Sequence, residues 1–193
     1  RGNAVLSLQA RFFIDWNATA SERYQKTFSE RYFPTLECLG DTAMQIVSTG
    51  PDNDCQKIKM GFVKMIYMAK KSIDIQTPYF IPDESVIEAL QVAALSGVKV
   101  RIMVPCKPDH PFVYRATEYY CRNLLKDGVE IYLYEEGFLH AKTMVVDGVA
   151  STVGTSNFDM RSFRLNFEIN AFIYDEEISC KLQDIFEKDI EKC

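Results

Sequence analysis

A histidine, a lysine and an asparagine carry the clearest chemical signal in the sequence. His140 and Lys142 are separated by one residue, and Asn157 follows after an apolar stretch and a short glycine-containing run. Side chains two residues apart in a strand share one face, so the imidazole and the ammonium are expected to point the same way. If the chain turns back after Lys142, Asn157 can lie beside them. The pattern therefore predicts three polar groups that converge on one point.

These groups suit a centre at which a phosphoryl group is transferred. Lys142 offers a point charge to phosphate oxygens, and Asn157 adds a neutral donor where negative charge builds up in the transition state. His140 can act as a nucleophile or as a proton donor near neutral pH. The sequence around them has no cluster of carboxylates suited to Mg²⁺. We therefore expect no metal and no cofactor, with fixed charges in their place.

The elements around these residues are predicted to form a hairpin. Residues 141–146 and 150–153 both have the pattern of short strands, and Asp147-Gly148 between them is a strong signal for a tight turn. Such a turn would return the chain toward His140. The hairpin is therefore the device that is expected to bring Asn157 to the histidine.

Helix and strand patterns alternate along the rest of the chain. The expected helices cover residues 4–16, 54–71, 84–96, 112–127 and 176–192. The expected strands cover residues 43–48, 73–76, 98–104, 129–134, 141–146, 150–153 and 166–174. This order predicts an α/β fold with a mixed β-sheet flanked by helices on both faces. One domain over residues 1–193 is expected, with residues 1–40 as an additional helical connection.

Composition narrows the class of protein. The chain has 193 residues, of which 47% are hydrophobic and 25% charged, and this suits one domain with a buried core. A net charge of -5 argues against a broad nucleic-acid-binding surface. The six cysteines show neither a C-x-x-C pair nor zinc-ligand spacing, so we expect reduced thiols. No apolar run approaches the ~20 residues of a membrane-spanning helix.

The complete motif around His140 resembles the signature of the phospholipase D superfamily, H-x-K-x4-D-x6-G-[ST]-x-N. Its positions are met by His140, Lys142, Asp147, Gly154, Thr155 and Asn157. Further segments are similar to the C-terminal half of bacterial cardiolipin synthases, namely TPYFIPD at 77–83, GFLHAK at 137–142 and DMRSFRLNFE at 159–168. The opening, with LQ at 8–9 and FIDW at 13–16, is also similar, so the resemblance covers essentially the whole chain.

This resemblance implies phosphatidyl transfer in phospholipid synthesis, with cardiolipin made from two phosphatidylglycerols through a phosphohistidine intermediate. The family uses two H-x-K motifs, whereas this sequence contains one, so an N-terminal half of the same enzyme is an expected partner. In the family the nucleophile usually comes from the N-terminal copy, which leaves His140 as the expected general acid and base. Glu168 resembles the family's acid that hydrogen-bonds the catalytic histidine and thereby fixes its tautomer.

Several other side chains near the motif are candidates for binding the substrate. They are Thr155, Ser156, Arg161, Arg164 and Tyr79. The Thr155 hydroxyl could reach the phosphate or only shape its loop, and the part played by Ser156 stays open. The two arginines could contact lipid head groups or form structural ion pairs. Tyr79 could line the substrate channel or pack in the core.

Three residues are expected to be structural. Asp147 belongs to the signature, yet Asp-Gly is a turn pair, and Gly154 is expected to shape the loop before Asn157. His110 comes just before a predicted helix, so a role at the start of that helix fits it better than catalysis.

Two other functions stay open at this point. A single-motif nuclease or phosphodiesterase of the same superfamily, completed by homodimerisation, would use the same chemistry, although the acidic charge argues against it. A non-catalytic scaffold half is the second, although the intact motif argues against that. The chain opens without a Met, so it is expected to be a piece of a longer protein. The piece itself is expected to be soluble, because it has no membrane span. The resemblance implies that the longer protein is held at the cytoplasmic face of the cell membrane.

Overall fold

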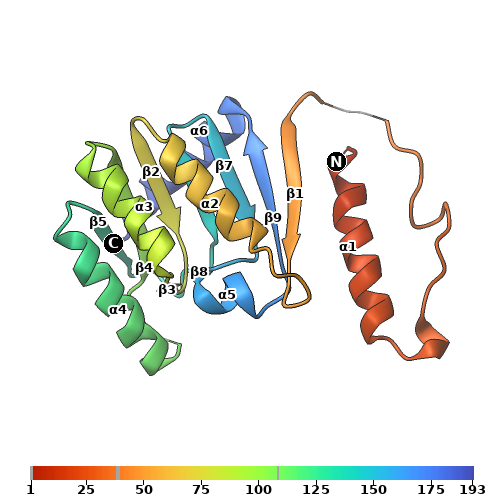
Figure 1. Cartoon of the computed structure of the whole chain (residues 1–193). Helices are drawn as coiled ribbons and strands as arrows, with labels where there is room; N and C mark the ends of the chain where they lie inside the picture. Colours follow the sequence, from red (N-terminus) through yellow and green to blue (C-terminus); the bar gives the residue numbers. More distant parts are fainter. Residues whose placement is uncertain (1, 38–39, 108) are drawn as a thin grey trace.

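The fold is built on a seven-stranded mixed sheet with the strand order β1-β9-β7-β6-β2-β4-β5 (Figure 1). The structure is a computed structural model that describes residues 2–37, 40–107 and 109–193. The strands are β1 (Ala43–Thr49), β2 (Ser72–Gln76), β4 (Lys99–Pro105), β5 (Glu130–Tyr134), β6 (Thr143–Val146), β7 (Ala150–Gly154) and β9 (Glu168–Tyr174). β2, β4 and β5 are parallel, and the neighbours from β2 through β6, β7 and β9 to β1 are antiparallel.

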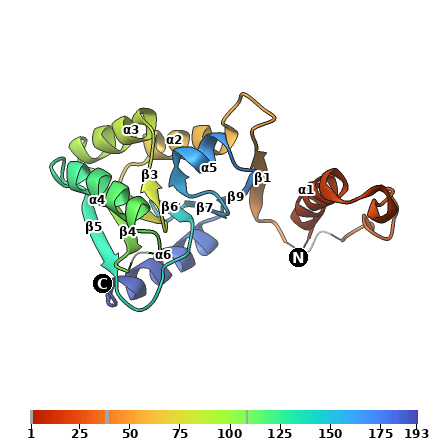
Figure 2. The same cartoon turned by 90° about the horizontal axis from the view of Figure 1, so that it is seen from below.

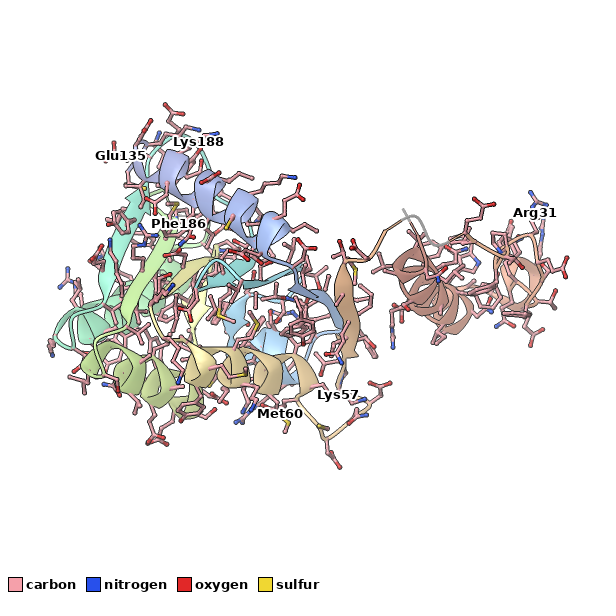
Figure 3. All side chains as sticks on the ribbon, turned by 90° about the horizontal axis from the view of Figure 1, so that it is seen from above. Arg31, Lys57, Met60, Glu135, Phe186 and Lys188 are labelled. Atoms are coloured by element: carbon pink, nitrogen blue, oxygen red, sulfur yellow. The ribbon has the colours of Figure 1, made fainter. Side chains whose placement is uncertain are left out.

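Helices cover both faces of this sheet, as the sequence predicts (Figure 2). One face carries α2 (Lys57–Met68), α3 (Glu84–Leu95) and α4 (Pro111–Leu125), and the opposite face carries α6 (Glu176–Ile190). Figure 3 shows Phe186 of α6 pointing toward the sheet, whereas Lys57 and Met60 lie on the outer side of α2. The predicted fold class is therefore confirmed.

The two faces of the sheet are packed by different means. Ile73 and Ile75 of β2 are fully buried in the large apolar cluster under α2 and α3. The alternate residues of the same strand point at α6, where Asp74 accepts a hydrogen bond from Gln183 at 3.0 Å and Gln76 donates one to Asp189 at 2.9 Å. The period of two along a strand explains this alternation.

Three of the short elements that were not predicted lie at one end of the sheet (Figure 1). They are β3 (Phe80–Ile81), β8 (Phe158–Asp159) and α5 (Met160–Arg164). β3 and β8 pair in parallel as a separate two-stranded sheet. Two-residue strands and a five-residue helix have no readable period, so the pattern could not reveal them.

Several expected boundaries also move. The strand expected over 141–146 begins at Thr143, because its partner β2 ends at Gln76, opposite Thr143, shortly before Pro78. The strand expected over 166–174 begins at Glu168. The helix expected over 54–71 is shorter, at Lys57–Met68.

The N-terminal segment lies beside the sheet at β1 (Figure 1). It contains α1 (Ala4–Thr19), of which no residue is buried, and a short 3₁₀ turn, η1 (Glu22–Tyr24). The Arg11 guanidinium lies over the Phe167 ring at 5.2 Å from its centre. That residues 1–193 form one domain, with residues 1–40 as a connection, stays a prediction.

Two expectations about the whole chain can be compared with the described residues. In those ranges no helix combines the length and the apolar character needed to cross a bilayer. The described cysteines carry free thiols, as expected, and Cys38 lies outside the described residues.

Candidate active site

The turn between β6 and β7 has the geometry that Asp-Gly predicts. Asp147 and Gly148 both have positive φ, at 55° and 69°, as the two central residues of a tight hairpin turn require. The Asp147 carboxylate also accepts hydrogen bonds from the backbone N–H groups of Lys70, Lys71 and Ser72 at 2.7–2.8 Å. This signature residue therefore joins the hairpin to the start of β2, at the end of β6 that lies away from His140.

Gly154, at the other end of β7, is required by close packing. A Cβ at this position would lie 2.3 Å from the Asn170 side chain and 2.4 Å from the carbonyl oxygen of Ile169. Its backbone N–H donates to the Lys142 carbonyl at 3.2 Å. The glycine thus lets β9 approach β7 and holds the chain beyond it against Lys142.

His140 and Lys142 lie in the extended segment just before β6. The His140 side chain is exposed and its ring centre is 5.6 Å from that of Phe138. The Lys142 ammonium folds back and donates to the His140 carbonyl at 2.8 Å. This bond joins Lys142 to the backbone of His140, and both residues precede the strand instead of starting it.

Lys142 sits in a half-buried place beside two carboxylates. Burial lowers its pKa below the ordinary value, and the charges of Glu168 and Asp159 act in the opposite direction. A lysine with a lowered pKa holds its proton less firmly than a surface lysine. The two carboxylates therefore favour the protonated form of Lys142, against the effect of burial.

Asn157 is placed by the start of α5. Its amide nitrogen donates to Asp159 at 3.2 Å, and its backbone N–H donates to the Ser162 hydroxyl at 3.3 Å. Asp159 in turn caps α5 by accepting from the Ser162 backbone N–H at 2.6 Å. The amide oxygen of Asn157 is buried and has no hydrogen-bond partner in the described structure.

Thr155 and Glu168 form a second polar pair beside Lys142. The Thr155 hydroxyl donates to the Glu168 carboxylate and accepts the Ile169 backbone N–H at 2.9 Å. The other oxygen of Glu168 accepts from the Asn166 amide at 3.0 Å. The expected hydrogen bond between Glu168 and the His140 ring is not formed between these two described side chains.

A groove of ≈ 820 Å³ opens next to these residues. It is lined by Tyr79, Ile81, His110, Val113, Asp159, Met160, Arg161, Arg164, Leu165 and Asn166. Three of the residues expected to bind substrate therefore line one hollow, namely Tyr79 and the two arginines. The Tyr79 hydroxyl donates to Asp109, and this bond, with burial and the nearby negative charges, raises the pKa of Tyr79 to about 12.

The structure also places two other residues that the sequence singled out, Ser156 and His110. Ser156 is 1% exposed, and its hydroxyl donates to the Asn157 carbonyl, so its contacts are with the protein. His110 stands at the N-cap of α4, as expected, but its side chain forms no capping hydrogen bond and faces the groove.

Asp159 and Asn166 are the polar residues of this region that the sequence did not reveal. Asp159 contacts Asn157 and influences Lys142, whereas Asn166 contacts Glu168. An aspartate three residues before Ser162 was a readable capping signal, but the helix behind it is too short to draw attention to it. Among the described residues, no three His, Cys, Asp or Glu side chains gather as a metal site would require.

The fold is that of the phospholipase D superfamily. The phospholipase D family member Nuc from Salmonella typhimurium superposes with a TM-score of 0.66 over 79% of this chain and 96% of that chain, at 19% identity. Identity this low supports the fold alone.

Sequence comparison defines the family more closely. Residues 62–190 match the family model described as cardiolipin synthase, PLD-like domain, and the chain belongs to this family. It is 56% identical over 191 residues to cardiolipin synthase of Listeria monocytogenes serotype 4a, and 53% identical over 190 residues to the major cardiolipin synthase ClsA of Bacillus subtilis. These alignments cover 99% and 98% of this chain but 39% of each relative.

Proposed function

We propose that this chain is one half of a phosphatidyltransferase that makes cardiolipin from two molecules of phosphatidylglycerol. The chain would supply one of two H-x-K half-sites. The observation that supports this most is that the Lys142 ammonium is bonded to the His140 carbonyl and lies within the influence of the Glu168 and Asp159 charges, in a chain of the cardiolipin synthase family. A scaffold would have no use for a half-buried lysine at this position.

The proposed reaction is a double displacement. A histidine of the other half attacks the phosphorus of the first phosphatidylglycerol. The bond from phosphorus to the oxygen of the head-group glycerol breaks, and His140 protonates that oxygen. The glycerol hydroxyl of the second phosphatidylglycerol then gives its proton to His140 and attacks the phosphorus. The phosphorus–nitrogen bond breaks, and the products are one cardiolipin and one glycerol.

The neighbours of His140 would stabilise charge in both steps. Lys142 would exchange its bond to the His140 carbonyl for the phosphate oxygens, and the Asn157 amide would add a neutral donor. Glu168 would act through Lys142, by favouring its protonated form, and would hold Thr155 in place. Asp159 would do the same for Lys142 and would orient Asn157.

The proposed partners follow from this half-site. The second H-x-K motif would come from an N-terminal half of the same enzyme, or from a second copy of this chain across a two-fold axis. The substrate would be a phospholipid and not a nucleic acid, and the enzyme would work at the cytoplasmic face of the cell membrane. A monomer of this chain would therefore be inactive by itself.

The test is a product balance with the full-length enzyme in detergent micelles of phosphatidylglycerol. Equal amounts of cardiolipin and released glycerol are expected. Phosphatidic acid in place of cardiolipin would indicate hydrolysis and contradict the proposal. Cleavage of DNA without any lipid product would favour a nuclease instead.

A further inference from the structure

The groove beside the half-site continues directly from it. Asp159 lines the groove and also contacts Asn157, and Asn166 lines the groove and also contacts Glu168. The same two residues thus form the wall on one side and belong to the surroundings of Lys142 on the other. A molecule in the groove would lie next to a phosphate held by Lys142.

The two arginines that line the groove are weakly paired, whereas the Asp159 carboxylate accepts hydrogen bonds from the protein. Arg161 forms no ion pair within the described ranges, and its one side-chain hydrogen bond, to Asn166, is long at 3.4 Å. The Arg164 side chain is 56% exposed, and its distance of 3.8 Å to Asp83 makes a loose pair. By contrast, Asp159, the carboxylate among the residues that line the groove, accepts two hydrogen bonds from the protein.

The rest of the wall is largely apolar. Ile81, Val113, Met160 and Leu165 line the groove, and Met160 and Leu165 are 39% and 66% exposed. A hollow with two weakly paired guanidinium groups and an apolar wall suits a ligand that has a phosphodiester and acyl chains. Water or free glycerol has neither a charge for the guanidinium groups nor an acyl chain for the apolar wall.

We propose that this groove binds the acceptor phospholipid, with Arg161 and Arg164 holding its phosphodiester one glycerol unit from the phosphorus under attack. This rests on the proposed function, because an acceptor site has meaning only if a second lipid attacks. It gives the enzyme a basis for preferring phosphatidylglycerol over water and small alcohols. A site built for an anionic group discriminates against ligands that lack it.

The test compares two acceptors with one donor. The full-length enzyme in phosphatidylglycerol micelles is assayed for cardiolipin formation and, separately, for exchange of labelled glycerol into phosphatidylglycerol. Both reactions use the same donor lipid, but only the first uses an anionic acceptor. Arg161→Gln and Arg164→Gln are compared with Arg115→Gln, an exposed arginine of α4 that pairs with Glu118 and does not line the groove.

Loss of the arginine contacts should lower the ratio of cardiolipin formation to glycerol exchange by about tenfold for Arg161→Gln, since a hydrogen bond to a charged group is involved. Arg161→Lys should restore part of the ratio, and Arg115→Gln should leave it unchanged. A ratio that stays constant in Arg161→Gln, whether both rates fall in parallel or neither changes, would overturn the acceptor site. Failure of the unaltered enzyme to make any cardiolipin would instead refute the proposed function.

Discussion

β6 is a strand of four residues, and the signature residues at its two ends have different surroundings. Before the strand, His140 is exposed, and the Lys142 ammonium donates a hydrogen bond to the backbone carbonyl of His140. After the strand, the Asp147 carboxylate accepts three backbone N–H groups and fixes the turn to the start of β2. One continuous signature thus covers an end that we propose is reactive and an end that is structural, and replacements at the two ends should separate activity from stability.

The largest effect is expected at the reactive end. His140→Ala should reduce cardiolipin formation by the full-length enzyme by at least about 10²–10⁴-fold, the range for a lost general acid or base, because both steps use this proton. The thermal unfolding midpoint should stay the same, since the side chain is exposed. Initial rates and thermal melts on the same preparations give the result. Turnover close to that of the unaltered enzyme would remove His140 from the mechanism.

The next effect is expected at the structural end. Asp147→Ala should lower the free energy of unfolding by about 2 kcal/mol, because three hydrogen bonds to a charged acceptor are lost. Asp147→Asn is the comparison variant, since Asn tolerates the positive φ of this turn but removes the charge and keeps only one of the two acceptor oxygens. Activity per folded molecule should be retained in both variants, as chemical denaturation and initial rates would show. Unchanged stability of Asp147→Ala would contradict the structural role.

The same carboxylate should make stability depend on pH. Burial acts to raise the pKa of Asp147, but the backbone N–H donors of Ser72, Lys71 and Lys70 outweigh it and hold the pKa below its usual value. A lowered folded-state pKa stabilises the protein above the unfolded-state pKa of about 4, and this contribution is lost as the pH falls through the folded-state value. The stability difference between the unaltered chain and Asp147→Asn should therefore narrow below about pH 4. A stability difference between the two proteins that stays constant with pH would contradict the lowered pKa of Asp147.

A smaller effect is expected from Glu168→Gln. Burial lowers the pKa of Lys142 and Glu168 opposes this, so removal of the Glu168 charge should lower that pKa further. The rate at neutral pH should fall by a few-fold, and the alkaline limb of the pH–rate profile should move to lower pH. The measurement is initial rate against pH. An unmoved limb would show that Glu168 does not act through Lys142.

The smallest effect is expected from metal removal. Lys142 supplies a positive charge where other phosphotransferases place a cation, so excess EDTA should leave turnover unchanged. A detergent-solubilised substrate separates this from effects of divalent ions on lipid packing. Loss of activity in EDTA that Mg²⁺ restores would be the contrary result.

The hairpin could be predicted because its determinants are local. Asp147-Gly148 alone specifies the turn, and the turn sets Gly154 against Lys142. The wall of the groove depends on contacts between distant segments. The Thr77 hydroxyl accepts the Phe158 backbone N–H at 3.2 Å, and the Thr117 hydroxyl accepts that of Phe80 at 3.2 Å. Such contacts hold β3 and β8 in place, and no periodic pattern records them, which is why Asp159 was not recognised.

The bond from the Lys142 ammonium to the His140 carbonyl has a consequence for selectivity. The carbonyl occupies one of the three N–H donors of the ammonium, and an incoming ligand competes with it for that donor. A neutral oxygen would exchange one bond for another of similar strength and gain little. An ionised oxygen adds the attraction between opposite charges to the hydrogen bond, so it competes better than the carbonyl does. We therefore expect Lys142 to favour charged ligands over neutral ones, whatever their shape.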